Sequence, residues 1–128
     1  MSDENLFENL DEETRKKIQE AQILEQSFQQ LLIQKQAFQH ELNETDFALK
    51  ELDKSEGDVF KVVGGQIMLK TSKEKLAQEL NDKKKLIELR IKNIDKQEKE
   101  FSDKLDSLRN EIMKKISPQT FKDGEEEE

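Results

Sequence analysis

The chain has 128 residues, of which 41% are charged and 32% hydrophobic, and its formal net charge at pH 7 is −8. A compact domain of this length normally carries more apolar residues, so the composition argues against a thick core and favours elongated helices. The lack of cysteine excludes disulfides and thiolate sites, and the acidic balance argues against binding nucleic acid or an anionic membrane.

The two ends carry most of the negative charge. We expect residues 1–10 to form an N-terminal tip segment and residues 117–128 an acidic tail that closes with Glu125–Glu128. Such a tail is most simply a solvated end, and contact with a basic partner is the alternative. No basic segment followed by an apolar run opens the chain, and no run of about 18 apolar residues follows. We therefore expect a soluble, cytoplasmic protein.

A first coiled-coil helix is predicted over residues 11–54. Asn9 or Asp11 can cap its start. Apolar residues then recur at the a and d positions of a heptad, and only Lys35 and Thr45 interrupt them. The predicted seam consists of Ala21, Leu24, Phe28, Leu31, Lys35, Phe38, Leu42, Thr45, Leu49 and Leu52.

A β-hairpin is predicted over residues 58–70, where the helical period is lost. Gly57 provides a stop for the first helix, and two strands rich in Val, Ile and Phe flank Gly64-Gly65. If these two glycines form a two-residue turn, Val62 lies opposite Ile67. Four side chains then share a wholly apolar face, namely Phe60, Val62, Ile67 and Leu69, and the other face is mixed, with Val59, Lys61, Val63, Gln66, Met68 and Lys70.

An isolated hairpin of this kind is marginal in water, because its apolar face and both of its edges are left uncovered. The hairpin either folds down onto its own helices or pairs with other subunits, and the second possibility makes it an assembly element. The predicted oligomerisation residues are Val59, Phe60, Val62, Val63, Ile67, Met68 and Leu69.

A second coiled-coil helix is predicted over residues 72–116, opened by a capping box of Thr71 with Glu74 and closed by Pro118. Its predicted seam consists of Ala77, Leu80, Lys84, Ile87, Ile91, Ile94, Glu98, Phe101, Leu105, Leu108, Ile112 and Lys115. The two helices must run antiparallel. The residue numbers of facing positions are expected to sum to about 129, which sets Lys35 opposite Ile94 and Thr45 opposite Lys84.

The two chain ends meet at the free end of this coiled coil. They carry apolar residues that lie beyond the seam or off it, which are Leu6, Phe7, Leu10, Ile18, Met113, Ile116 and Phe121. These side chains either close the end of the coil or, if the ends splay, form a surface that adapts to many apolar partners.

The helix, hairpin, helix order resembles the β-type subunits of prefoldin, especially the archaeal form. The resemblance covers about residues 12–116. It is carried by Asn43-Glu44-Thr45, by the strand Asp58-Val59-Phe60-Lys61-Val62-Val63-Gly64, and by Arg90, Ile94 and Gln97-Glu98. The acidic tail is not required by the family.

The resemblance implies a mainly α fold, a long antiparallel two-helix coiled coil joined by a β-hairpin that assembles into an intersubunit β-barrel. It implies a hexamer of two α-type and four β-type subunits. It also implies ATP-independent capture of non-native client proteins at the coiled-coil tips, and their delivery to a group II chaperonin. The chain-end residues above would then bind clients.

Catalysis is not expected. The chain has no Gly-rich phosphate loop and no Cys, and its single histidine, His40, falls on the outer face of the first helix. No cofactor or metal is therefore expected. The leading hypothesis is a chaperone subunit that holds non-native proteins. The alternative is a structural coiled-coil spacer or adaptor, and a nucleic-acid-binding arm is disfavoured by the charge.

Overall fold

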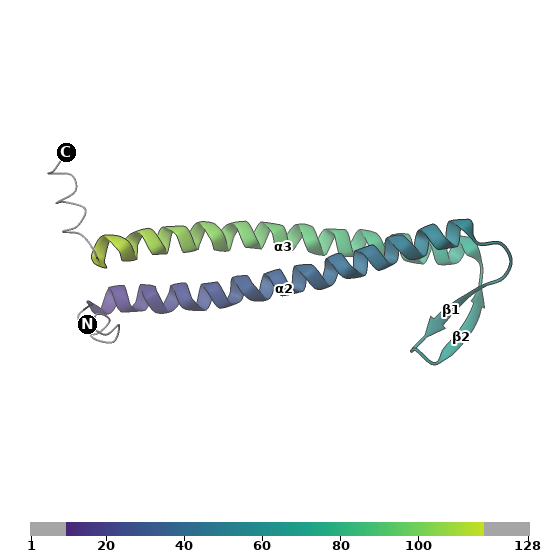
Figure 1. The fold of residues 1–128 in the computed structure, drawn as a ribbon, viewed down its shortest axis with the longest axis horizontal. Helices are drawn as coiled ribbons and strands as arrows, with labels where there is room; N and C mark the ends of the chain where they lie inside the picture. Colours follow the sequence, from purple (N-terminus) through teal and green to yellow (C-terminus); the bar gives the residue numbers. More distant parts are fainter. Residues whose placement is uncertain (1–9, 117–128) are drawn as a thin grey trace. The chain divides into compact units, whose positions relative to one another are not determined.

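Two long helices flank a short β-hairpin in the computed structural model, which describes residues 10–116 (Figure 1). The order is α2 (Glu12–Lys54), β1 (Val59–Val63), β2 (Ile67–Thr71) and α3 (Lys73–Ile116). Residues 1–9 of the predicted tip segment and the acidic tail 117–128 lie outside the described residues, and so do the predicted Asn9 cap and the Pro118 stop.

Helix α2 begins after a capping residue and ends before a glycine. The Asp11 Oδ1 atom accepts a hydrogen bond from the Thr14 backbone amide at 2.7 Å, which satisfies one of the free amides of the first turn. At the other end, the Ser55 hydroxyl donates to the Leu52 carbonyl at 2.8 Å. Gly57 follows with a φ of 95°, a conformation that favours glycine and carries the chain away from the helix axis.

Helix α3 begins one residue later than the predicted capping box requires. Ser72, and not Thr71, is the cap, because the Ser72 hydroxyl oxygen accepts a hydrogen bond from the Lys75 amide at 3.1 Å. Thr71 is instead the last residue of β2, where it pairs with Val59. Because Thr71 still pairs within the hairpin, the cap of α3 lies one residue later than predicted.

The hairpin register differs by one residue from the prediction. The two-residue turn is wrong, since Val63 pairs with Ile67 and Val62 with Met68. The loop has three residues, because Gln66 closes the turn through its amide to the Val63 carbonyl at 3.3 Å and does not join the ladder. Gly64 and Gly65 take φ angles of 63° and 71°, which other residues rarely adopt.

This register overturns the predicted wholly apolar face. Paired residues of an antiparallel ladder point to the same side of the sheet, and neighbours along a strand alternate. The outer face is therefore Phe60, Val62, Met68 and Lys70. The inner face is Val59, Lys61, Val63, Ile67, Leu69 and Thr71. Each face carries a lysine among its apolar side chains.

The described chain divides into two units that each contain a segment of both helices. Unit 1 is Met1–Leu32 with Lys96–Glu128, and unit 2 is Ile33–Asp95, which includes the hairpin. In unit 1, Leu31, Leu105 and Leu108 are buried. Thr14 is also buried, and cross-helix ion pairs flank this core, including Lys104 with Glu20 at 3.2 Å.

Unit 2 has its own core, in which Ile87 is only 2% exposed and Ile91 and Ile94 are also buried. Buried Thr45 donates its hydroxyl hydrogen to the Glu41 carbonyl at 2.8 Å, so this polar seam residue is satisfied within its own helix. The Arg90 guanidinium lies 5.6 Å from the centroid of the Phe38 ring, a cation–π contact between the helices.

The seam residues deduced from the heptads lie at buried or half-buried positions in both helices, with the exception of exposed Lys115. Polar seam residues reach acidic partners across the helix pair of unit 2. Lys35 contacts Asp95 at 2.6 Å and Lys84 contacts Asp46 at 2.8 Å. These partners are one residue away from those expected, because a long lysine side chain leaves the apolar seam to reach a carboxylate at its edge.

Candidate assembly surface and chain-end surface

The hairpin leaves most of its large apolar side chains exposed. Six of them are exposed in the isolated chain, namely Phe60, Val62, Val63, Ile67, Met68 and Leu69. The outer face is the more open side, since Val62 is 62% and Met68 67% exposed. The structure therefore brings the predicted oligomerisation residues together on one small element, and of these only Val59 is half-buried.

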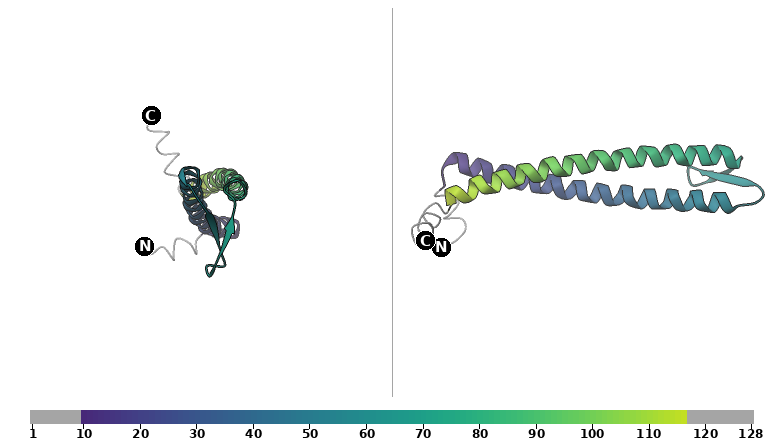
Figure 2. Two further views of the ribbon diagram at one scale, coloured as in Figure 1. Left: turned by 90° about the vertical axis from the view of Figure 1, so that its right-hand side faces the viewer. Right: turned by 90° about the horizontal axis from the view of Figure 1, so that it is seen from above.

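The inner face lies toward α3 of the same unit. The Lys61 ammonium group contacts the Glu79 carboxylate at 3.3 Å, and Val59, Lys61 and Thr71 are half-buried. The end-on view on the left of Figure 2 shows the hairpin projecting to one side of the helix segments next to it. Val63, Ile67 and Leu69 of the inner face nevertheless remain exposed, so the chain's own helices do not cover this face.

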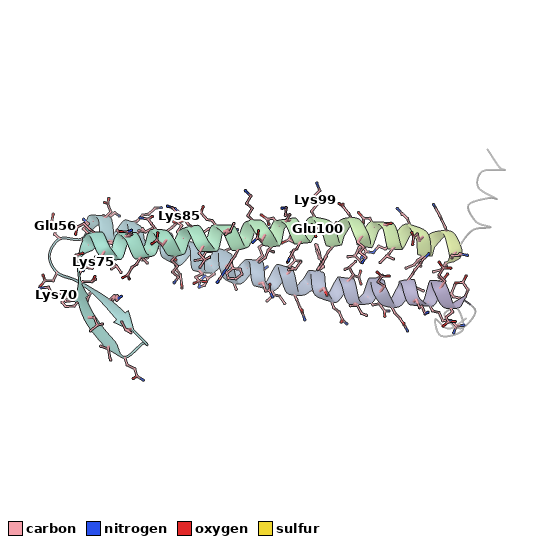
Figure 3. The ribbon with its side chains drawn as sticks, turned by 180° about the vertical axis from the view of Figure 1, so that it is seen from behind. Glu56, Lys70, Lys75, Lys85, Lys99 and Glu100 are labelled. Carbon is pink, nitrogen blue, oxygen red and sulfur yellow. The ribbon has the colours of Figure 1, made fainter. Side chains whose placement is uncertain are left out.

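The base of the hairpin is held by polar contacts. The Lys73 ammonium group donates to the Asp53 carbonyl at 2.9 Å, and Lys70 contacts Asp58 at 3.5 Å. Lys70 and the nearby Lys75 and Glu56 are seen around this base (Figure 3). These contacts fix where the hairpin leaves the helices and leave its apolar faces uncovered.

Both edges of the hairpin remain open in the described chain, because its sheet contains only β1 and β2. The outward amide and carbonyl groups of an edge strand are a template for pairing with a further strand. Apolar faces and open edges together give the hairpin what it needs to join a larger sheet.

The described part of the chain-end surface belongs to unit 1. Met113 is 50% and Ile116 38% exposed, whereas Leu10 and Ile18 are half-buried. The remaining predicted client-binding residues lie outside the described part of the chain, and they are Leu6, Phe7 and Phe121.

Ion pairs join the helix ends beside this surface. Lys17 contacts Glu111 at 3.3 Å, and Lys115 contacts Asp11 at 3.5 Å. The hydrogen bond from Lys17 to Glu111 raises the pKa of the Lys17 ammonium group above its ordinary value, against an opposing desolvation effect. The described helix ends are therefore held together by polar contacts at their margin, with Met113 and Ile116 exposed beside them.

Sequence reasoning assigned no role to a second group of exposed apolar residues on the outer helix positions. They are Ile23, Ile33, Phe47, Leu86 and Leu89. All lie off the a and d positions, and the only signal in the sequence is an apolar residue where a coiled coil normally carries a polar one.

Two classes of site receive no support from the described residues. No group of three or more His, Asp or Glu side chains within residues 10–116 is placed to hold a metal ion. Neither α2 nor α3 has a stretch apolar enough to cross a membrane.

Comparison with known proteins places this architecture in a family. The family described as "Prefoldin subunit" matches residues 15–119. The prefoldin subunit beta of Pyrococcus furiosus is 31% identical over 116 residues, covering 89% of this chain and 98% of that protein. The prefoldin subunit beta of Saccharolobus islandicus strain L.S.2.15 is 33% identical over 124 residues, covering 93% of this chain and 98% of that protein.

A solved structure shares the fold. The crystal structure of the prefoldin beta subunit from Thermococcus strain KS-1 matches with a TM-score of 0.78 and 30% identity, covering 86% of this chain and 97% of that one. Two long helices joined by an antiparallel hairpin are thus confirmed as the fold class. The chain belongs to the prefoldin subunit family, and the identification of a β-type subunit made from its sequence is confirmed.

Proposed function

We propose that this chain is the β-type subunit of an ATP-independent chaperone that holds non-native proteins. Two α-type and four β-type subunits would form the complex, their hairpins building intersubunit β-barrels. The complex would work in the cytoplasm and pass its clients to a group II chaperonin. The proposal assigns the chain no reaction and no cofactor, because holding a client requires surface contacts and no covalent chemistry.

One observation carries the assembly part of this proposal. The hairpin exposes six large apolar side chains, although the seam of the same chain buries comparable ones. Full burial of such a side chain is worth about 1.5–3 kcal/mol, so strands from other subunits would gain substantially by covering them. Prefoldin subunits are the partners that the family membership supports.

The client-binding part of the proposal rests on the chain-end surface. Met113 and Ile116 are exposed near the C-terminal end of α3, and Leu10 and Ile18 lie half-buried in the same unit. Leu6, Phe7 and Phe121 would add to this surface from the undescribed ends. Each subunit offers only a small apolar area, so a client would be held by weak contacts to several subunits at once.

The test is suppression of aggregation by the chain assembled with an α-type prefoldin subunit. We expect the complex to delay aggregation of a chemically denatured enzyme without any nucleotide. Met113→Asp with Ile116→Asp should reduce this suppression several-fold, because charges at both positions remove apolar contact. Ile33→Asp, at an exposed position of unit 2, is the matched control and should suppress as the unaltered complex does.

Three results would count against the proposal or a part of it. An assembled complex that does not delay aggregation would support the spacer or adaptor alternative. Full suppression by the Met113 and Ile116 variant would move the client-binding surface to other residues. Failure of a loaded complex to transfer its client to a group II chaperonin would remove the delivery step alone.

A further inference from the structure

A short apolar stripe on α3 begins on the side of the helix that faces the hairpin. An α-helix turns by about 100° per residue, so Leu86, seven residues after Glu79, projects within about 20° of the same direction and about 10 Å further along the axis. Leu89 follows three residues later, about 60° around the helix from Leu86 and about 80° from Glu79. Leu86 is 49% and Leu89 55% exposed.

Glu79 ties this side of α3 to the inner face of the hairpin. Its carboxylate contacts the Lys61 ammonium group at 3.3 Å, and Lys61 projects from the inner face. The labelled Lys85 lies toward the edge of α3 away from the hairpin in Figure 3, as expected for a residue about 100° around the helix from Leu86. In the α3 stripe, which consists of Leu86 and Leu89, Leu86 therefore lies on the side of the inner face, and Leu89 lies further around the helix, about 40° from Lys85.

Both surfaces are apolar and neither is covered by the other. Val63, Ile67 and Leu69 of the inner face are exposed, as are both leucines of the α3 stripe. Charged residues surround the stripe, and Lys83, next to it on the helix, is engaged with Glu41 at 3.4 Å. An apolar centre with a charged rim is the usual anatomy of a protein interface.

We propose that a β-hairpin of a neighbouring prefoldin subunit packs on the α3 stripe, so that the assembly surface extends from the hairpin onto α3. This inference rests on the proposed function, because it requires subunits that assemble through their hairpins. Continuity with the inner face identifies the occupant, since a strand added beside this hairpin brings side chains to the same side of α3. Leu86 and Leu89 then give the added hairpin an apolar seat in addition to strand pairing.

The chain contains no cysteine, so a single introduced thiol can report on each position. Leu86→Cys and Leu89→Cys are compared with Ile23→Cys, which replaces an exposed apolar residue of α2 in unit 1. Each variant is labelled with a maleimide, alone and after mixing with an α-type prefoldin subunit, and the mass of every sample is measured. Assembly should slow labelling at positions 86 and 89 by about ten-fold or more and leave position 23 nearly unchanged, because thiol modification follows access.

The outcomes separate this inference from the proposed function. If the measured mass shows a complex and the thiols at 86 and 89 still react as fast as in the single chain, the α3 stripe is not an assembly surface and the proposed function stands. Protection that appears only when a denatured client is added would make the stripe a client-binding surface and overturn the inference. If no complex forms, the assembly part of the proposed function fails, and this inference fails with it.

A double variant without a thiol tests whether the labelling result reflects only a local effect of the introduced cysteine. Leu86→Asp with Leu89→Asp should weaken assembly and leave the helix content of the single chain unchanged, because both positions are outside the seam. If this double variant assembles over the same range of protein concentration as the unaltered chain, the inference is overturned.

Discussion

The helix seam and the hairpin contain similar apolar side chains and place them in opposite environments. Ile87, Ile91 and Ile94 of the seam are at most 8% exposed, whereas Val62, Ile67 and Met68 of the hairpin are each more than half exposed. The seam is completed by the other helix of the same chain. The hairpin has only two strands in the described chain, and the proposed function assigns its completion to other chains.

The magnitudes favour several subunits in the proposed assembly through the hairpin. Six half-exposed side chains, each worth about 1.5–3 kcal/mol on full burial, offer several kcal/mol per hairpin. Association costs about 4–15 kcal/mol in lost freedom of motion, so one pair of apolar faces gives a weak complex. Strand pairing at both edges adds backbone hydrogen bonds, and a closed ring of hairpins uses every edge.

The largest expected effect is the loss of assembly when a charge is placed on the outer face of the hairpin. Phe60→Asp should weaken assembly with an α-type prefoldin subunit more than about 100-fold, since a buried carboxylate without a partner costs several kcal/mol. Phe47→Asp is the matched control, because Phe47 is 65% exposed on α2 and lies off the seam. Sedimentation of both variants measures the result.

If the Phe60 and Phe47 variants both assemble as the unaltered chain does, the outer face of the hairpin is no more important for assembly than the rest of the exposed surface. Loss of assembly in both would instead show that the interface also reaches the outer side of α2.

A smaller effect is expected when the seam itself is altered. Ile87→Ala should lower the free energy of unfolding by about 2–5 kcal/mol, because it leaves a cavity at a position that is 2% exposed. Ile33→Ala removes the same atoms at a position that is 65% exposed and should cost less than about 1 kcal/mol. Urea unfolding of the single chain, followed by helix content, measures both. If both variants lose a similar amount of unfolding free energy, the burial of Ile87 in the seam does not stabilise the fold as stated.

The smallest effect concerns the cap of α2. Hydrogen bonds from the Thr14 hydroxyl and amide lower the pKa of the Asp11 carboxyl below its ordinary value, with a smaller contribution from the Lys115 charge. A lowered pKa means that the carboxylate stabilises the fold above the ordinary pKa of an aspartate, and that this stability is lost as pH falls through the lowered value.

Asp11→Asn keeps a capping side chain and removes the charge. Its urea midpoint should lie slightly below that of the unaltered chain at pH 7. The difference between the two midpoints should shrink as the pH falls through the lowered pKa and the Asp11 carboxyl becomes protonated. If the difference in urea midpoint does not depend on pH, the ionised Asp11 carboxylate does not stabilise the start of α2. Asp11→Ala, which removes the cap as well, should remain less stable at every pH tested.

The helical part of the fold could be predicted because its signals are repeated. Each heptad adds the same information, so Lys35 and Lys84 did not obscure the seam, and Leu52 of α2 and Leu108 of α3 are both buried. The hairpin could be located but not placed in register. A Gly64-Gly65 pair suits either a two-residue or a three-residue loop, and only the hydrogen bond from Gln66 to Val63 decides between them.

The candidate sites could be predicted only as far as they follow from a local pattern. The run of apolar residues in β1 and β2 made an exposed hairpin predictable, although the residues on each face were assigned wrongly. Leu86 and Leu89 carried no such signal, because single apolar residues on the outside of a helix are common. Their significance depends on the Lys61 and Glu79 contact, which joins residues far apart in the sequence.

Hydrogen exchange of the hairpin amides tests most directly whether other chains complete it. In the single chain, the outward amides of Val59–Val63 and Ile67–Thr71 face no further strand and should exchange rapidly. After assembly with an α-type prefoldin subunit they should slow by about 100-fold or more, and amides within α2 of unit 1 should change little. Unchanged hairpin exchange, in a sample whose mass shows a complex, would contradict assembly through β1 and β2.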